Sequence, residues 1–166
     1  MTIPKLDLAD FTVVKMDFDG PDWRADIPAE PGWYAIETNA PLSALAKCPL
    51  PGIGSKHYKI AKRIEDAKFL IDQKVAFAPK KKGDSYIVYS GEHGNLKARA
   101  REHVGGNKGT GCLALNQYGA LTTYTWRFRY LTCEAHVPGS DGNKMLRNYL
   151  EQQWRTTEGW PVLCAR

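Results

Sequence analysis

The sequence predicts an α+β domain, in which strand-like runs alternate with amphipathic helical patterns. The runs are rich in aromatic and β-branched residues, as strands are. The helical stretches repeat apolar residues at helical spacing. The chain has 166 residues, of which 43% are apolar, and this is enough for one domain with a buried core. In chain order the expected strands are 33–36, 85–89 and 123–134, and the expected helices are 58–75, 96–104 and 143–155.

The N-terminal residues 1–30 alternate short apolar runs with Asp, Gly and Pro. This composition indicates a surface arm or an edge strand, and Phe11–Val14 is the candidate strand. The dipeptide Pro31-Gly32 marks a break, and the β-type run 33–36 follows it directly. We therefore expect the first core strand to begin at this break.

Residues 40–84 form a basic insertion between the first two core strands. Its first part carries several prolines and glycines, so a loop is expected there. From about 58 to 75 the pattern is helical, with lysines opposite the apolar face. Lys80, Lys81 and Lys82 then form an exposed basic turn. The apolar face of the expected helix comprises Ile60, Ile64, Ala67 and Ile71.

A strand and a capped helix follow the insertion. The strand 85–89 is expected to be broken by Gly91 and Gly94. Asn95 is a favourable N-cap, because its side-chain oxygen can accept from an N–H of the first turn. The helix then runs through Leu96 to Val104, and a flexible glycine-rich loop, 105–111, comes next.

The longest strand is expected at 123–134, before a turn at 138–142 and the last helix. Side chains alternate between the two faces of a strand. One face of this strand carries Trp126, Phe128 and Tyr130, and the other carries Thr125, Arg127 and Arg129.

Charge is distributed unevenly along the chain. Residues 1–39 carry three Lys or Arg against eight Asp or Glu, a balance of −5. Residues 40–84 carry ten against four, a balance of +6, and residues 85–166 carry ten against six, a balance of +4. A basic middle and C-terminal part favours a polyanionic partner, although many soluble proteins with pI near 9 have none.

Composition argues against several other classes of protein. No apolar run approaches the length of a membrane helix, and the N-terminus lacks an export signal, so a cytoplasmic protein with no membrane partner is expected. None of the four cysteines sits in a CxxC or CxxH pair. We therefore expect reduced, mostly buried thiols and no zinc site.

One ordered set of residues points to chemistry. It comprises Gly32-Trp33-Tyr34 on the first core strand, Tyr89-Ser90-Gly91 at the end of the second, Asn95-Leu96 opening a helix, and then Arg99 and His103. The set resembles the motifs of the GIY-YIG nuclease superfamily and is most similar to its type II restriction endonuclease-like members. The resemblance covers about residues 31–38 and 85–163. It implies a small, mainly antiparallel three-stranded sheet flanked by helices, in a single nuclease domain that spans 1–166.

The resemblance also implies a role for each residue of a catalytic centre built from Tyr34, Tyr89, Arg99, His103 and Glu151. His103 takes a proton from Tyr34, which then accepts one from the attacking water. Arg99 and Tyr89 hold the scissile phosphate. Glu151, on the last helix, is the metal-binding glutamate for Mg2+ or Mn2+, and the cation stabilises the leaving 3′-oxygen.

The residue types fit this chemistry on physical grounds. Arg99 and His103 are four positions apart and project from one face of a helix. The guanidinium can fork onto phosphate oxygens, and the imidazole can exchange a proton near neutral pH. One carboxylate suffices for a cation that keeps most of its waters, as magnesium does.

Other interpretations of the same residues stay open. Both tyrosines fit the core of a sheet, Arg101 is a rival of Arg99, and His103 suits a helix C-terminus. Glu134 and Glu158 are rivals of Glu151. The sequence also departs from the family's pattern. Ser90 replaces a branched apolar residue, and Leu163-Cys164 stands where an asparagine is usual.

The expected function is metal-dependent endonuclease cleavage of double-stranded DNA, of restriction or mobile-element type, by a monomer or a homodimer. The alternative is a DNA-binding protein of the same fold that has lost cleavage, and RNA is a weaker third substrate. The insertion is a candidate DNA clamp, because lysines contact phosphates without reading sequence. Arg127 and Arg129 could line the DNA groove or pair with the acidic arm. The candidate DNA-binding residues are Lys80, Lys81, Lys82, Lys97, Arg101, Lys108, Arg127 and Arg129.

Overall fold

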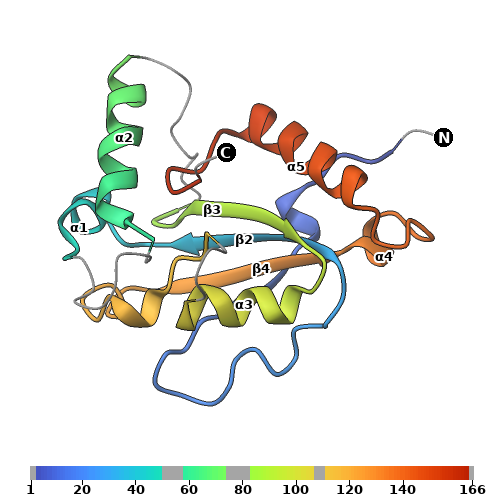
Figure 1. The fold of residues 1–166 in the computed structure, drawn as a ribbon, viewed down its shortest axis with the longest axis horizontal. Helices are drawn as coiled ribbons and strands as arrows, with labels where there is room; N and C mark the ends of the chain where they lie inside the picture. The colour runs from blue at the N-terminus through green and yellow to red at the C-terminus, as the bar shows by residue number, and fades with distance from the viewer. Residues whose placement is uncertain (1–2, 50–57, 74–82, 107–110, 165–166) are drawn as a thin grey trace.

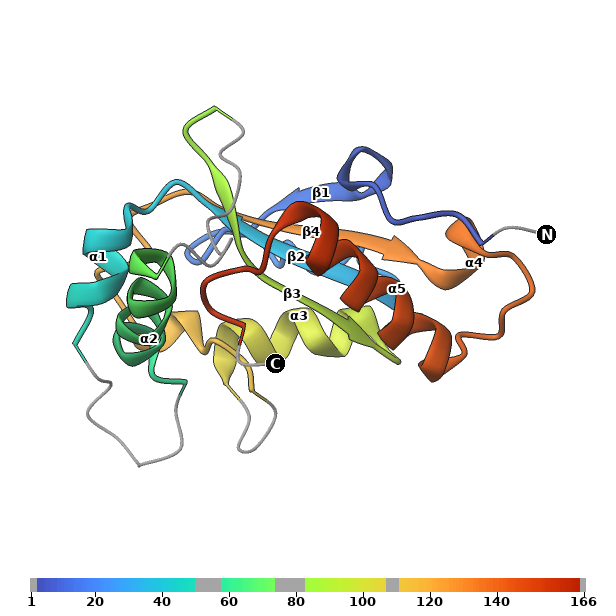
Figure 2. The same ribbon diagram turned by 90° about the horizontal axis from the view of Figure 1, so that it is seen from above.

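The computed structural model describes residues 3–49, 58–73, 83–106 and 111–164. An antiparallel sheet lies in the middle, with α3 (Leu96–Gly105) on one face and α5 (Lys144–Glu158) on the other (Figure 1). Helices α1 (Leu42–Lys47) and α2 (Ile60–Asp72) lie beside one end of the sheet in both views (Figure 2). This arrangement confirms the predicted α+β class.

The sheet has four strands in the order β1-β4-β2-β3, and every neighbouring pair is antiparallel. Three strands were expected, and the fourth, β1, comes from the N-terminal arm and pairs with β4 at the edge. The arm therefore contributes the edge strand that its apolar run indicated, shifted by one residue. The strands are β1 (Thr12–Lys15), β2 (Gly32–Thr38), β3 (Tyr86–His93) and β4 (Trp126–Thr132).

The strand β3 does not end at Gly91, as the sequence led us to expect, but continues to His93. Gly91 pairs with Tyr34 of β2, and a Cβ at this position would lie 2.3 Å from the Tyr34 hydroxyl oxygen. The glycine is therefore required inside the strand, because the Tyr34 ring lies against its backbone.

The helix α3 begins where the capping residue predicted. The Asn95 side chain accepts a hydrogen bond of 2.8 Å from the backbone N–H of Ala98. Cap and helix therefore follow the strand after a turn of only two residues, 94–95, which fixes α3 close to the end of β3.

Part of the insertion also follows the prediction. Ile60, Ile64 and Ala67 are buried on one face of α2, as expected, and the side chain of Ile71 lies outside the described residues. The short helix α1 was not predicted, because the prolines on either side of it indicated a loop. Its six residues are mostly good helix formers, and Leu45 anchors them in the core.

The strand β4 is shorter than predicted, because Thr132 ends it and caps a short helix. The Thr132 hydroxyl accepts a hydrogen bond of 3.2 Å from the N–H of Ala135, and α4 (Cys133–His136) follows. Two 3-10 turns, η1 (Leu8–Asp10) and η2 (Leu115–Gln117), complete the described elements. The last helix, α5, occupies the predicted region and extends three residues further.

Two apolar clusters cover the two faces of the sheet. The larger one joins the sheet to α1, α2 and α3, and its sheet residues include Tyr34, Ile36 and Phe128. The smaller one joins the sheet to α5 and the N-terminal arm, through Trp33 and Ala35 among others. Alternate residues of β2 therefore serve opposite faces, as a strand requires.

All four cysteines are free and buried in this structure, as expected. Among the described residues, no helix is both long and apolar enough to cross a membrane.

Candidate active site

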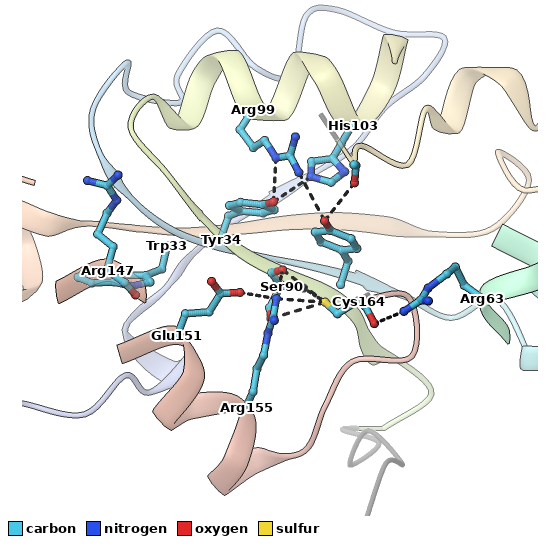
Figure 3. A network of polar contacts seen from close by, with 12 residues as sticks. Trp33, Tyr34, Arg63, Ser90, Arg99, His103, Arg147, Glu151, Arg155 and Cys164 are labelled. Atoms are coloured by element: carbon cyan, nitrogen blue, oxygen red, sulfur yellow. Dashed lines mark hydrogen bonds and ion pairs between the residues drawn. The ribbon is translucent and has the colours of Figure 1, made fainter. Parts of the chain in front are cut away.

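The hydroxyl of Tyr34 is the centre of a buried polar group between β2 and α3 (Figure 3). Arg99 donates to it through Nε at 2.8 Å, and His103 lies 3.1 Å from it through Nε2. All three side chains are buried, with exposed fractions of 2% for Tyr34, 6% for Arg99 and 0% for His103. Two residues one helical turn apart thus converge on one phenolic oxygen, as the spacing predicted.

Aromatic rings hold this hydroxyl in place. The Tyr34 ring stacks on Phe128 with centroids 5.5 Å apart, and on Tyr89 with centroids 6.2 Å apart. The ring of His103 packs against the edge of Tyr89 at 4.9 Å. Stacked and edge-on rings have few alternative positions, so the geometry around Tyr34 is fixed by packing as well as by hydrogen bonds.

The hydrogen bonds of His103 assign its neutral tautomer. The backbone N–H of Leu113 donates to Nδ1 over 3.2 Å, so this nitrogen carries the lone pair. The proton of the neutral ring is then on Nε2, which faces Tyr34. In this state the imidazole donates to the Tyr34 oxygen. Taking a proton from Tyr34, as the sequence led us to expect, requires the other tautomer.

Arg99 links Tyr34 to two further groups. Its Nη1 forms an ion pair of 2.7 Å with Glu102, and its Nη2 lies 3.5 Å from the hydroxyl of Tyr89. The Tyr89 hydroxyl in turn donates to the carbonyl of Gly111 at 3.1 Å. Glu102 was missed in the sequence, although its position three residues after Arg99 on the same helix is a recognisable pairing distance.

Burial changes the acidity of this group. It raises the pKa of the Tyr34 hydroxyl well above its usual value, and Arg99 opposes the change. Burial also lowers the pKa of His103 well below its usual value, and the Arg99 charge adds to that effect. Both residues are therefore neutral in the resting state at neutral pH.

Glu151 lies on the other face of the sheet. It projects from α5 toward Ser90, while Arg99 and His103 project from α3 toward Tyr34 (Figure 3). A space of about 10 Å3 beside Glu151 is lined by Tyr34, Ser90 and Gly91 and otherwise by apolar residues, Trp33 and Trp154 among them. This volume holds at most one water molecule. The structure thus brings four of the five expected residues together and sets Glu151 apart from them.

The carboxylate of Glu151 is buried beside a guanidinium. It forms an ion pair with Arg155, one helical turn further along α5, and its exposed fraction is 7%. Burial raises the pKa of this carboxyl, and the charge of Arg155 acts in the opposite direction. The oxygen in this ion pair is Oε1, which is buried and faces Nη2 of Arg155.

The rival glutamates lack this environment. Glu134 is exposed and accepts a hydrogen bond from the backbone N–H of Gly139. Glu158 is exposed at the end of α5. Arg101, the rival of Arg99, is also exposed. Glu151 and Arg99 are therefore buried, whereas all three of their alternatives are exposed.

The residues around Glu151 do not fit a divalent cation in this arrangement, because Arg155 engages the carboxylate. In the described part of the chain, no group of three or more His, Cys, Asp or Glu side chains is arranged to hold a metal. A cation at Glu151 would have to displace the guanidinium of Arg155 from Oε1. The adjoining space of about 10 Å3 has no room for the waters that Mg2+ or Mn2+ keeps.

The candidate DNA-binding residues have different surroundings. Lys97 donates to the carbonyl of Ala25 at 2.8 Å, and so ties α3 to the N-terminal arm. Arg127 and Arg129 both pair with Glu37 of β2, at 3.1 Å and 2.5 Å, rather than with the arm of residues 1–30. Lys80, Lys81, Lys82 and Lys108 lie outside the described residues.

The comparisons with known proteins identified no relative of this chain. Searches with this chain found no matching protein-family model, no matching curated protein and no matching solved structure.

Proposed function

We propose that this chain is a metal-dependent endonuclease that hydrolyses DNA phosphodiester bonds, of restriction or mobile-element type. One observation carries the proposal. The Tyr34 hydroxyl receives hydrogen bonds from Arg99 and His103 next to Tyr89, and these residues stand in the order of the GIY-YIG motifs.

The two donors give Tyr34 a specific chemical capacity. An oxygen that accepts from both Nε of Arg99 and Nε2 of His103 is stabilised as a phenolate, because both hydrogen bonds strengthen when the oxygen is charged. The Tyr34 hydroxyl first gives its proton to solvent, and the resulting phenolate accepts a proton from water as the water oxygen attacks phosphorus. The bond from phosphorus to the 3′-oxygen then breaks, and that oxygen takes a proton from solvent.

Arg99 and Tyr89 supply the contacts for the phosphate. The guanidinium has three nitrogen atoms with N–H donors, and the phosphate oxygens compete with Glu102 for those of Nη1. Positive charge in a buried site stabilises the pentavalent transition state more strongly than it would in water.

Glu151 is the residue that would hold a divalent cation, once its carboxylate exchanges the contact with Arg155 for the cation. When bound, Mg2+ or Mn2+ supplies Lewis-acid stabilisation of the leaving oxygen. Its rivals, Glu134 and Glu158, are exposed.

Double-stranded DNA is the proposed substrate. The balance of +6 over residues 40–84 and of +4 over 85–166 favours a polyanion. Arg101 is exposed on the helix that carries Arg99, and we propose it as a contact for the DNA backbone. Either a monomer or a homodimer on DNA is compatible with one such centre in each chain.

A second candidate, a DNA-binding protein without cleavage, is favoured by one observation. Glu151 is paired with Arg155 and lies across the sheet from the tyrosines. A supercoiled-plasmid assay with Mg2+, Mn2+ or EDTA separates the two candidates. Nicking or linearisation supports the nuclease, whereas gel retardation without cutting supports the binding protein.

Two substitutions with matched controls assign the cleavage to this site. Arg99→Lys keeps the charge but loses the planar guanidinium and its paired N–H donors. We therefore expect the rate of cleavage to fall by about 100-fold or more. Arg24→Lys, at an arginine of the arm that pairs with Asp22, is its control. Glu151→Gln abolishes metal-dependent cutting, and Glu158→Gln on the same helix does not. Wild-type rates in both Arg99→Lys and Glu151→Gln would sink the assignment.

A further inference from the structure

The hydroxyl of Tyr58, which lies just before α2, is a buried donor that lacks an acceptor. Its oxygen is shielded from solvent and makes no hydrogen bond of normal geometry with the described residues. The nearby guanidinium of Arg63 cannot take the phenolic proton, because arginine has donors only. Burial raises the pKa of Tyr58, so the proton stays on this oxygen at neutral pH. A buried donor of this kind lowers stability unless another molecule supplies the acceptor.

Arg63, at the beginning of α2, is a second incomplete donor. Its Nη2 donates to the carbonyl of Cys164 at 2.5 Å, which anchors the guanidinium to the C-terminal segment (Figure 3). Its Nη1 lies 3.9 Å from Asp66, which is too long for a hydrogen bond. Its Nε is buried and has no hydrogen bond in the described part of the chain. The guanidinium is therefore held in place while some of its N–H donors are unused.

Both residues lie beside the candidate active site. The ring of Tyr58 packs edge-on against the ring of Tyr89, with centroids 6.1 Å apart. The Tyr89 hydroxyl lies 3.5 Å from Nη2 of Arg99. The backbone carbonyl of Tyr58 accepts a hydrogen bond from the hydroxyl of Tyr118, which fixes the start of α2 against the segment that precedes β4. Tyr58 and Arg63 therefore flank the proposed phosphate contacts on the side of the insertion.

The surroundings of these donors are positively charged. Lys59 and Lys62 are exposed next to them, and no Asp or Glu occurs between positions 58 and 63. The next two acidic residues along α2, Glu65 and Asp66, both pair with Lys62. Unused N–H and O–H donors beside positive charge match an anion with acceptor oxygens, as a phosphodiester has.

We propose that Tyr58 and Arg63 bind a DNA phosphate next to the scissile one, so that the start of α2 helps to hold the substrate. The proposal rests on the proposed function, which assigns the scissile phosphate to Arg99 and Tyr89. The Tyr58 hydroxyl is shielded in the free chain, and a change of side-chain rotamer on binding, which is common at interfaces, brings it to the phosphate oxygen. Such contacts position the DNA without reading its sequence.

Fluorescence anisotropy of a fluorescein-labelled DNA duplex in EDTA measures this contact without cleavage. Tyr58→Phe removes only the hydroxyl, and we expect Kd for the duplex to rise by about 10-fold, as for a lost hydrogen bond to a charged group. The midpoint of urea unfolding is expected to stay the same or rise, because the hydroxyl has no acceptor to lose. Tyr124→Phe is the matched control, since Tyr124 is also a partly buried tyrosine packed on the larger apolar cluster. It is expected to leave Kd unchanged.

Arg63→Gln tests the charged partner through the salt dependence of binding. We expect the slope of log Kd against log salt concentration to fall by about one, as for the loss of one phosphate contact. Arg24→Gln is its control, because the side chains of Arg24 and Arg63 have the same exposed fraction of 27%. The slope is expected to be unchanged in Arg24→Gln.

Wild-type Kd in Tyr58→Phe would overturn the proposal, and so would equal losses in a variant and its control. Tyr58→Phe decides the matter if Arg63→Gln does not fold, since it leaves every charge and the ring in place. The plasmid assay is read separately. A chain that binds the duplex through Tyr58 and Arg63 but leaves plasmid intact defeats the proposed cleavage and not this phosphate contact. Plasmid cleavage by a chain whose Tyr58→Phe variant keeps wild-type Kd defeats the phosphate contact alone.

Discussion

The two faces of the strand pair β2–β3 hold polar residues in opposite ways. On the α3 side, a neutral phenol is surrounded by rings and by two donors, Arg99 and His103. On the α5 side, Glu151 and Arg155 form a charged pair, and Ser90 and Cys164 anchor the guanidinium. The first arrangement is suited to moving a proton, since its oxygen can change charge. The second is suited to fixing a charge in one place.

The largest effect is expected from removing the hydroxyl at the centre of the α3 side. Tyr34→Phe removes the hydroxyl and leaves the donors of Arg99 and His103 without their shared acceptor. We expect plasmid cleavage to fall by about 100- to 10,000-fold, the range that general acid–base groups contribute. Tyr130→Phe is the control, because Tyr130 pairs with Tyr34 across β2 and β4 and keeps its ring. Cleavage within a few-fold of wild type in Tyr34→Phe would exclude a catalytic role for the hydroxyl.

A smaller effect is expected from filling the space that lets Tyr34 lie across β3. Gly91→Ala puts a Cβ 2.3 Å from the Tyr34 hydroxyl oxygen, so the ring or the strand must shift. The free energy of unfolding in urea is expected to fall by about 1–3 kcal/mol. Gly94→Ala is the control, since its Cβ would meet nothing closer than Arg147 Nη2 at 4.0 Å. Equal effects of the two substitutions would contradict the packing argument.

The next prediction concerns the pH dependence of stability that buried His103 causes on the α3 side. Because the pKa of buried His103 lies well below its usual value, the unfolded chain binds a proton that the folded chain does not. Its stabilising effect is present above the unfolded pKa of about 6.5 and is lost as pH falls below it, by at most about 1.4 kcal/mol per pH unit. Urea unfolding between about pH 5 and 7.5 measures this slope, which should be shallower in His103→Gln. Parallel slopes in the two proteins would mean that His103 is not the group responsible.

The smallest effect is expected from Cys164→Ser on the α5 side. A hydroxyl can replace the thiol among Ser90 and Arg155, so the cost in urea unfolding should stay below about 1 kcal/mol. Cys133→Ser is the comparison, because Cys133 is buried in the apolar cluster with Trp33 and Leu150. An unpaired hydroxyl there costs about 1–3 kcal/mol. A larger cost at Cys164 than at Cys133 would show that the sulfur itself is needed.

Local signals in the sequence predicted much of the α3 side. The spacing of Arg99 and His103 and the capping residue Asn95 depend only on helix geometry, so they could be recognised without a structure. The order of the motifs then indicated that Tyr34 and Tyr89 lie on core strands. The role of Gly91 was misjudged, because a glycine that ends a strand and one that admits a neighbouring ring look alike in a sequence.

The α5 side could not be predicted in the same way. The pair of Glu151 and Arg155 has a helical spacing, but its meaning depends on Ser90 and Cys164, which join it only after folding. Short elements were missed for a related reason. The helix α1 is stabilised by burial of Leu45, and proline punctuation alone does not reveal this.

The insertion leaves and re-enters the sheet at neighbouring points, because Thr38 and Tyr86 are paired in β2 and β3. Each doubling of a flexible loop adds only about 0.6 kcal/mol to the entropy cost of closing it. Length added between these two residues, outside α1 and α2 that pack in the core, therefore costs the strands on either side little. The chain can thus vary in length there while Tyr34 and Tyr89 remain stacked.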